Sequence, residues 1–376
     1  MSNICFIVNS PFSKRDFARF GISEIQDRKF NVLILDCTPI FDNDYDKAIS
    51  GNDICIKNKF VKRCYKLRNL LNYLIEFQPK YCVNLLGGFS INSYLERVLI
   101  RILLKILTKT IEYRLFTIPD ENIKSKDLKI LFREVFKNII LSILSLPWTL
   151  IQSDIVAISG FYEFKKIKPR QKVIFAHNLD YDIFLKNQKS RIPLIKTKSL
   201  LFLDEDFPCH VDYIRTGKKP INDEKKYYKD ISFLLKNLSR SLNLNPIVKL
   251  HPRANVEKCS SLYDVPISTS NTVKLIFESD LVLAHCSTSI QLAVLCYKPI
   301  ILIMPNELNR KSYWAKLIEI FALKLNLQII EVDHINRIKY IPSVDKEKYK
   351  NYISDYIKTP NSLKSYSWEL ITDNLN

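Results

Sequence analysis

The stretch DLVLAHCSTSIQLAVLCYKPIILIM, residues 280–304, indicates most directly how this chain folds. Two short apolar runs, at 281–285 and 299–304, flank a segment at 287–297 whose apolar residues have helical spacing. The pattern therefore predicts a strand, a helix and a second strand. Strands that are connected through a helix in this way usually lie parallel in one sheet, with the helix on its face.

The same alternation of strands and helices continues through both halves of the 376-residue chain. Strands are predicted at 4–9, 30–36, 81–87, 113–118, 154–159 and 172–177 in the first half, and at 200–204, 246–251, 281–285, 299–304 and 327–333 in the second. Helices are predicted at 60–77, 91–109, 126–146, 224–242, 272–278, 287–297 and 311–324, with two short ones within 344–373. This pattern favours an α/β fold with two Rossmann-like domains facing a cleft, the arrangement known as GT-B.

A polar, basic stretch at 186–198 is the best candidate for a linker between the two domains. It predicts an N-terminal Rossmann-like domain over 1–190 and a C-terminal one over 196–340. Residues 341–376 are expected to form helices that pack back towards the N-terminal domain.

The composition excludes several other classes of protein. With 47% hydrophobic residues and only 6 glycines and 16 prolines, the chain is neither collagen-like nor disordered. The nine cysteines are odd in number and form no CxxC pair, so we expect reduced thiols, no zinc site and no disulfide framework. Residues 1–10 lack the features of a signal peptide, and the apolar stretch at 139–151 is too short to span a bilayer. These features predict a soluble, cytoplasmic protein.

The net charge of +18 suits three kinds of partner: nucleic acid, anionic lipid and phosphorylated substrates. Part of the excess reflects an AT-rich coding sequence, because Ile, Asn and Lys are all abundant. No nucleic-acid motif accompanies the charge, so no nucleic-acid partner is expected.

Ligands of parallel α/β sheets bind beyond the carboxyl ends of the strands, so the residues that follow each strand are the candidates for a site. His251, Pro252 and Arg253 end the strand at 246–251. The proline makes the chain turn there, and histidine and arginine both donate hydrogen bonds to phosphate. The alternative is an ordinary solvated turn.

His285, Ser287, Thr288 and Ser289 lie between a strand and an apolar helix. Hydroxyl side chains at this position cap a helix, and the N-terminus of a helix also attracts anions. Because this strand follows that of His251 by one strand–helix unit, we expect two adjacent strand ends that both donate to a phosphate. The alternative is helix capping alone.

Carboxylates follow two further strands. Asp180 and Asp182 come after the strand at 172–177, which ends in His177. Either carboxylate could act as a general base on a hydroxyl group. Asp182 could instead cap the helix that follows. After the other strand, Asp204 is a candidate for the cleft, whereas Glu205 is expected in a simple acidic loop.

Three segments have the Asp-x-Asp spacing that can hold a divalent ion on a nucleotide diphosphate. They are Asp42/Asp44/Asp46, Asp180/Asp182 and Asp204/Asp206. Three matches in one chain show how common this spacing is, so we assign no metal to any of them.

A basic stripe runs along the predicted helix at 91–109, beside an apolar face. The stripe consists of Arg97, Arg101, Lys105 and Lys109, and the apolar face of Val98, Leu99, Ile102, Leu103, Ile106 and Leu107. A helix of this kind can lie on an anionic membrane surface, which would make the protein peripheral on the inner face of the cytoplasmic membrane. The alternative is an ordinary domain helix with its polar face in water.

Four of these stretches together resemble a family of bacterial surface-polysaccharide glycosyltransferases, related to the capsule-type transferases of Kdo and to bacterial sialyltransferases. They are VIFAHNLDYDIFL, LFLDEDFPCHVDY, VKLHPRANVEK and DLVLAHCSTSIQLAVLCYKPIILI. The resemblance is densest from about 172 to 304, whereas the first 170 residues match only in general pattern.

The resemblance implies a GT-B fold, an N-terminal domain for the acceptor and a C-terminal domain for a CMP-activated sugar. The family's His-Pro motif, which binds the CMP phosphate, maps onto His251 and Pro252, and its hydroxyl pair maps onto Ser287 and Thr288, or onto Thr288 and Ser289. The family's acidic pair followed by glycine has no match here, and Asp180 is the nearest positional counterpart of its general base.

The main hypothesis is an inverting, metal-independent transferase without a cofactor. It would move a nonulosonic acid (sialic, pseudaminic or legionaminic type) or Kdo from CMP to a lipid-linked or oligosaccharide acceptor of a cell-surface glycan. One alternative is a GT-B transferase or epimerase that uses another nucleotide sugar. A nucleic-acid-binding protein is the alternative from a different class, although the aromatic residues do not gather with the basic ones.

Overall fold

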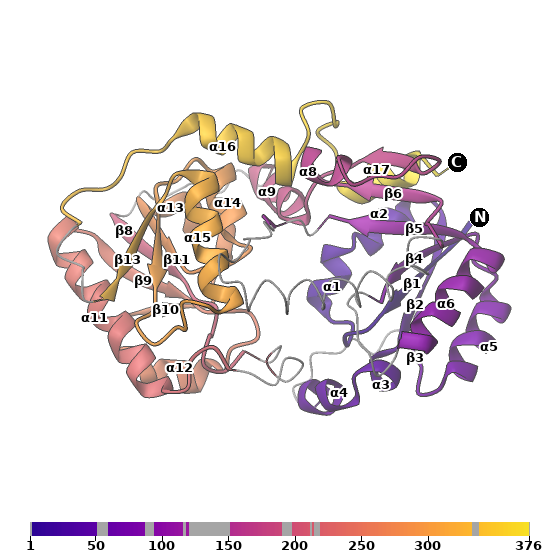
Figure 1. Ribbon diagram of the computed structural model, residues 1–376, viewed down its shortest axis with the longest axis horizontal. Helices are drawn as coiled ribbons and strands as arrows, with labels where there is room; N and C mark the ends of the chain where they lie inside the picture. The colour runs from indigo at the N-terminus through magenta and orange to yellow at the C-terminus, as the bar shows by residue number, and fades with distance from the viewer. Residues whose placement is uncertain are drawn as a thin grey trace, which may run out of the picture.

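The structure, a computed structural model, contains two parallel sheets with helices packed against them (Figure 1). It describes residues 2–50, 59–86, 94–115, 118–119, 151–189, 198–210, 213, 219–332 and 338–375. The predicted helix at 126–146 and most of the predicted linker at 186–198 lie outside these residues. The predicted fold class, two Rossmann-like α/β domains, is confirmed.

Seven described strands form the N-terminal sheet, in the order β3-β2-β1-β4-β5-β6-β7, and all are parallel. They are β1 (Ser2–Val8), β2 (Phe30–Asp36), β3 (Val61–Arg63), β4 (Tyr81–Leu85), β5 (Lys109–Arg114), β6 (Ile155–Ile158) and β7 (Lys172–Phe175). The helices of this half are α1 (Lys14–Arg19), α2 (Ile22–Asp27), α3 (Thr38–Phe41), α4 (Asn43–Ser50), α5 (Leu67–Phe77), α6 (Tyr94–Leu107), α8 (Phe161–Phe164) and α9 (Leu179–Lys189).

Six described strands form the C-terminal sheet, in the order β10-β9-β8-β11-β12-β13. They are β8 (Ser199–Leu203), β9 (Asn245–Lys249), β10 (Ile267–Ser268), β11 (Leu281–Ala284), β12 (Ile300–Met304) and β13 (Gln328–Glu331). The helices are α11 (Glu224–Leu242), α12 (Val256–Leu262), α13 (Thr272–Glu278), α14 (Ile290–Leu295) and α15 (Tyr313–Leu325).

Alternating residues of the central strands bury both faces of the N-terminal sheet. On β1, Ile4 and Phe6 belong to one apolar cluster, whereas Cys5 and Ile7 belong to another. Helices α5 and α6 cover the face of Cys5, and α2 covers the face of Phe6. A strand that is buried on both sides has no polar alternation, and this is why these strands are apolar throughout.

The order of the second sheet corrects the expectation that the His251 strand end lies next to the strand end at 285. Strand β8 lies between β9 and β11, because Leu201 pairs with Ile247 on one side and with Val282 on the other. The two-residue strand β10, which the sequence analysis missed, extends the sheet on the β9 side before the chain crosses over β8. With strands about 4.8 Å apart, the two ends are ~10 Å apart.

Further differences from the prediction concern β3, β5 and α14. The predicted helix at 60–77 is a three-residue strand, β3, followed by α5. Strand β5 begins four residues before the predicted start at 113, because Thr110 is held by hydrogen bonds to the carboxylate of Asp154. Helix α14 is shorter than predicted, because the residues before Ile290 form a turn.

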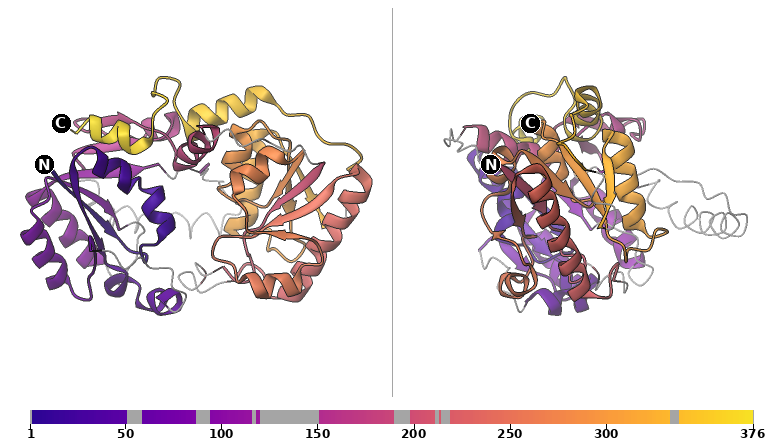
Figure 2. Two further views of the ribbon diagram at one scale, coloured as in Figure 1. Left: turned by 180° about the vertical axis from the view of Figure 1, so that it is seen from behind. Right: turned by 90° about the vertical axis from the view of Figure 1, so that its left-hand side faces the viewer.

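The chain crosses between the domains twice. In α9, Leu179 belongs to the N-terminal core, whereas Tyr181 and Leu185 belong to the C-terminal core. The C-terminal segment returns through α16 (Lys346–Tyr352), a π-helical turn η3 (Ile353–Ile357) and α17 (Ser367–Asp373). Figure 2 shows this segment running from the C-terminal domain back across the N-terminal one.

The last helix is anchored by aromatic packing. Trp368 of α17 makes an edge contact with Phe6, at 5.0 Å between ring centroids, and stacks on Tyr113 at 5.4 Å. At the other end of the segment, Tyr349 and Tyr352 of α16 are buried in the C-terminal core. The segment therefore ties the two domains together.

One glycine is required where this segment passes β6. A Cβ added to Gly160 would lie 2.1 Å from the backbone oxygen of Asp355, so no larger residue fits without moving η3. We predict that Gly160→Ala lowers the free energy of unfolding by about 1–3 kcal/mol, as overpacking usually does. Chemical denaturation measures the effect. Asp355→Ala, which keeps the backbone oxygen, is the control, and an equal loss in both variants would contradict the steric explanation.

Candidate functional site

Two hydrogen bonds between the domains show that the carboxyl ends of the two sheets face each other. Asn178, after β7, donates through Nδ2 to Oε1 of Gln291 in α14 at 2.5 Å. Arg253, after β9, donates through Nη1 to the Tyr45 hydroxyl of α4 at 2.7 Å. The residues predicted for the site lie along the boundary that these two contacts mark.

The His251 turn lies at this boundary, as the sequence analysis expected. Its Nδ1 accepts a hydrogen bond from the backbone N–H of Arg253 at 3.3 Å, which fixes the turn, and Pro252 is exposed. The imidazole is half-buried and makes an edge contact with the ring of His210, at 4.6 Å between centroids.

The hydroxyl loop, Ser287 to Ser289, lies on the other side of β8. Thr288 is exposed and the two serines are half-buried. The backbone N–H of Ser289 donates to Oγ of Ser287 at 3.2 Å, while Ser289, at the N-cap of α14, makes no capping bond through its side chain. Helix capping by the Ser289 side chain therefore does not explain why this residue before α14 carries a hydroxyl group.

A buried acidic segment, Asp204 to Asp206, follows β8 and lies between these two loops. The sequence analysis expected Glu205 to lie in a simple acidic loop, but the structure buries its carboxylate. Both of its carboxylate oxygens accept from the backbone N–H of Cys286 at 3.2 Å, directly before the hydroxyl loop. Burial raises the pKa of the Glu205 carboxyl to about 8.

Asp204 does not line an open cleft either, because it is buried beneath the aromatic residues of α11. Its Oδ1 accepts from the backbone N–H of Asp206 at 3.0 Å and lies 3.4 Å from the Tyr227 hydroxyl. Asp206 accepts from the Tyr228 hydroxyl at 2.9 Å. Burial raises the pKa of Asp204 to about 7 and also raises the pKa of Asp206. We therefore assign this segment to the floor beneath the site.

His285 lies in the core and is removed from the candidate donor site. Its Nδ1 is 2.8 Å from the backbone oxygen of Ile303 and its Nε2 is 2.9 Å from the Tyr227 hydroxyl, so both nitrogens are engaged. The ring stacks on Phe207, and burial lowers the pKa of His285 to about 4. A neutral, fully bonded imidazole has no proton to donate to a phosphate.

His177 is likewise structural. Its ring is fully buried, with Nδ1 2.8 Å from the Ser367 hydroxyl and Nε2 bonded to the backbone oxygen of Ser365. Burial lowers its pKa to about 4. His177 therefore holds the C-terminal segment against the end of β7 and does not line the cleft.

The sequence analysis offered Asp182 as a cap of the helix that follows it, but Asp182 lies within α9 and caps α17 instead. Its Oδ1 accepts from the backbone N–H of Ser367 at 2.9 Å. Burial raises the pKa of Asp182 to about 7. This carboxylate therefore has a structural partner in the C-terminal segment.

Asp180 is the second residue of α9 and is half-buried. Its backbone N–H donates to Oδ1 of Asn178 at 2.8 Å, and the side-chain amide of Asn178 reaches Gln291. The start of α9 is thus joined to the start of α14, two residues after Ser289. The structure therefore brings the Asp180 segment to the hydroxyl loop.

Asn178 and Gln291 are the residues that the sequence analysis missed. Both are buried, and Gln291 also contacts the Tyr352 hydroxyl at 3.4 Å. The sequence does carry a signal for them, because Gln291 is a single amide within the apolar run IQLAVL. A buried amide needs partners, which predicts a contact with another polar segment.

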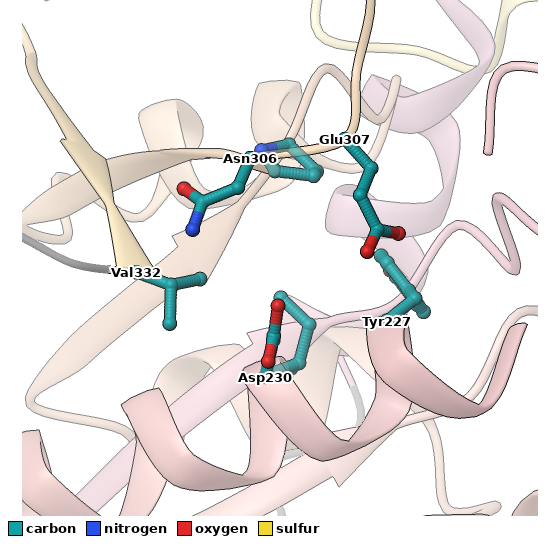
Figure 3. A pocket seen from close by; sticks show the side chains of 7 residues that line it. Tyr227, Asp230, Asn306, Glu307 and Val332 are labelled. Atoms are coloured by element: carbon teal, nitrogen blue, oxygen red, sulfur yellow. The ribbon is translucent and has the colours of Figure 1, made fainter. Parts of the chain in front are cut away.

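A small hollow lies beside the floor, at the carboxyl end of β12 (Figure 3). Its lining residues are Tyr227, Asp230, Ile231, Pro305, Asn306, Glu307 and Val332. Lys226 pairs with Asp230 at 2.6 Å and with Glu307 at 2.9 Å next to it. None of the predicted site residues lines this hollow. Within the described part of the chain, no group of three His, Cys, Asp or Glu side chains is arranged to hold a metal ion.

Comparisons with known proteins give structural neighbours only. No protein-family model and no curated protein matches the sequence. Among solved structures, the UDP-GlcNAc 2-epimerase of Methanocaldococcus jannaschii is similar at 13% identity, with 99% of each chain covered and a TM-score of 0.49. The wall teichoic acid polymerase TagF is similar at 10% identity, covering 96% of this chain and 85% of that one, with a TM-score of 0.49. MurG of Acinetobacter baumannii is similar at 10% identity, covering 89% and 87%, with a TM-score of 0.44.

The buried Glu205 carboxyl makes the stability of the protein depend on pH. The folded state binds this proton more tightly than the unfolded chain, so the free energy of unfolding falls as the pH rises from about 4.5 to about 8. Glu205→Gln keeps an oxygen for the Cys286 N–H but cannot ionise. We predict that it raises the melting temperature by several degrees relative to the wild type at pH 8.5, and by much less at pH 5.

Thermal unfolding at the two pH values measures this difference. Glu257→Gln, at an exposed position of α12, is the control and should behave like the wild type. A Glu205→Gln protein whose stability relative to the wild type did not change with pH would contradict the burial of a protonated carboxyl.

Proposed function

We propose that this chain is a GT-B glycosyltransferase that moves a sugar from a nucleotide-activated donor to a glycan acceptor, with inversion and without a metal ion. The observation that carries the proposal is the hydrogen bond between Asn178 and Gln291. It joins the helix start that bears Asp180 to the helix that follows the hydroxyl loop. A carboxylate of one domain and hydrogen-bond donors of the other thus share one boundary.

The C-terminal domain supplies these donors on both sides of β8. His251 and Arg253 lie on one side, and Ser287 and Thr288 lie on the other. A separation of ~10 Å suits a nucleotide that lies across the end of β8 and places its phosphate among imidazole, guanidinium and hydroxyl groups. Such donors stabilise the charge that develops on the leaving nucleotide.

Asp180 is the proposed general base. In an inverting transfer the base takes the proton of the acceptor hydroxyl. The oxygen of that hydroxyl attacks the anomeric carbon of the donor sugar. The bond to the donor phosphate breaks at the same time, and the nucleotide leaves with the electron pair. Asp180 suits this role because it lies at the start of α9, on the segment that Asn178 joins to the other domain through Gln291.

The donor that we propose is a nucleotide-activated sugar as a class. A CMP-activated nonulosonic acid or Kdo, which the sequence resemblance implies, is the narrower form of the proposal. A UDP-sugar is the first alternative, as in the UDP-GlcNAc 2-epimerase named above. The proposed acceptor is lipid-linked or an oligosaccharide, and the requirement for an acceptor distinguishes transfer from epimerisation.

The nucleotide is identified by thermal-shift measurements with CMP, CDP, UDP and GDP. We predict that one of them raises the melting temperature selectively, because a ligand at 100 times its Kd stabilises the folded state by about 2.7 kcal/mol. The shift should persist in excess EDTA and should be lost in His251→Ala. A shift that required magnesium or manganese, or one that His251→Ala retained, would contradict the proposed phosphate site.

The base is tested with a matched pair of variants. We predict that Asp180→Asn lowers transfer by about 10²-fold or more while the nucleotide-induced thermal shift is unchanged, since the amide cannot accept the proton. Asp182→Asn should keep most of the activity, because its amide oxygen can still accept from the Ser367 N–H. Initial rates with the donor identified above measure both. An inactive Asp182→Asn beside an active Asp180→Asn would exchange the two roles.

A further inference from the structure

Helix α6 presents an uninterrupted apolar stripe to the outside of the molecule. Four large side chains form it, with exposed fractions of 70% for Leu95, 60% for Leu99, 39% for Ile102 and 75% for Ile106. Their spacing of four, three and four residues places them on one face of the helix. Among the described helices, none other exposes more than two large apolar side chains.

The rotation of α6 about its axis is the reverse of the one expected for an ordinary domain helix, whose basic stripe would face water. Arg97 is buried, with Nη1 donating to the backbone oxygen of Leu86 at 3.0 Å and the guanidinium 4.8 Å from the ring centroid of Phe41. Arg101 is half-buried, and Lys105 pairs with Asp154. The first three residues of the basic stripe therefore lie towards the body of the domain, while the apolar residues point away from it.

The surroundings of the stripe are basic at its C-terminal end. The helix ends at Leu107, two residues before the exposed Lys109. The backbone N–H of Lys109 donates to the oxygen of Lys80, which is also exposed, so these two lysines are neighbours. These two lysines form a basic rim beside the apolar stripe, in a chain of net charge +18. Such a combination suits an interface that is apolar inside and negatively charged at its surface.

We propose that the outer face of α6 docks on an anionic lipid bilayer, with Leu95, Leu99, Ile102 and Ile106 entering the boundary between headgroups and acyl chains. The lysine rim contacts the lipid phosphates, and each such contact is weakened by salt. The helix lies on the side of the N-terminal domain that faces away from the C-terminal domain (Figure 1), so docking leaves the domain boundary open. No helix of the described residues is long and apolar enough to cross a membrane. The proposal does not depend on the transfer activity.

Flotation with lipid vesicles tests this surface directly. We expect the wild type to float with vesicles that contain phosphatidylglycerol and to float much less with pure phosphatidylcholine, and 0.5 M salt should lower but not abolish its binding (about 0.5 M shortens the screening length to a few ångströms). The double variant Leu99→Gln/Ile106→Gln should reduce binding at least tenfold, roughly the effect of ~1.4 kcal/mol. Leu323→Gln/Leu363→Gln is the matched control, because these leucines are 68% and 71% exposed elsewhere on the surface.

Three kinds of result would overturn the proposal. The first is a flotation result: the wild type does not float with anionic vesicles, or the Leu99→Gln/Ile106→Gln variant (the face variant) floats like the wild type. The second is a drop of several degrees in the melting temperature of the face variant alone, which would show that another part of the chain covers the stripe. The third is a dimeric wild type beside a monomeric face variant in light scattering, which would make a second copy the occupant.

Discussion

The buried amide pair between Asn178 and Gln291 is the contact on which the geometry of the site depends. Both side chains are removed from water, and a buried polar group without a partner costs far more than an ordinary hydrogen bond contributes. The pair therefore fixes one relative position of α9 and α14. Because Asn178 also accepts from the backbone of Asp180, the same residue positions the proposed base.

Different contacts hold the two sides of the domain boundary. On the side of α9, the amide pair is reinforced by the C-terminal segment, which is anchored in one core by Tyr349 and in the other by Trp368. On the far side, the contact that we identify is the hydrogen bond from Arg253 to Tyr45.

The sequence predicted the alternation of strands and helices well, including α11 and α13 with their observed ends, and it placed the His251 turn and the hydroxyl loop at strand ends. It could not predict that β8 separates these two loops, because apolar periodicity identifies strands and says nothing of their order. Nor could it place His177 and Asp182, whose partner Ser367 lies about half the chain away. For α6 the helix was predicted correctly, but the rotation about its axis depends on the contacts of Arg97 with Leu86 and Phe41.

The acidic segment lies under the two donor loops, where negative charge would oppose the binding of a phosphate. Three consecutive carboxyls, Asp204 to Asp206, lie between the loops that we assign to a phosphate, and as anions they would repel it. Burial raises the pKa of each, to about 7 for Asp204 and about 8 for Glu205, which lowers their negative charge and weakens this repulsion. The hydroxyl of Tyr228 and the N–H of Cys286 hold the segment in place. The floor thus supplies rigidity, while Arg253 supplies positive charge and His251 a hydrogen-bonding ring at the proposed donor site.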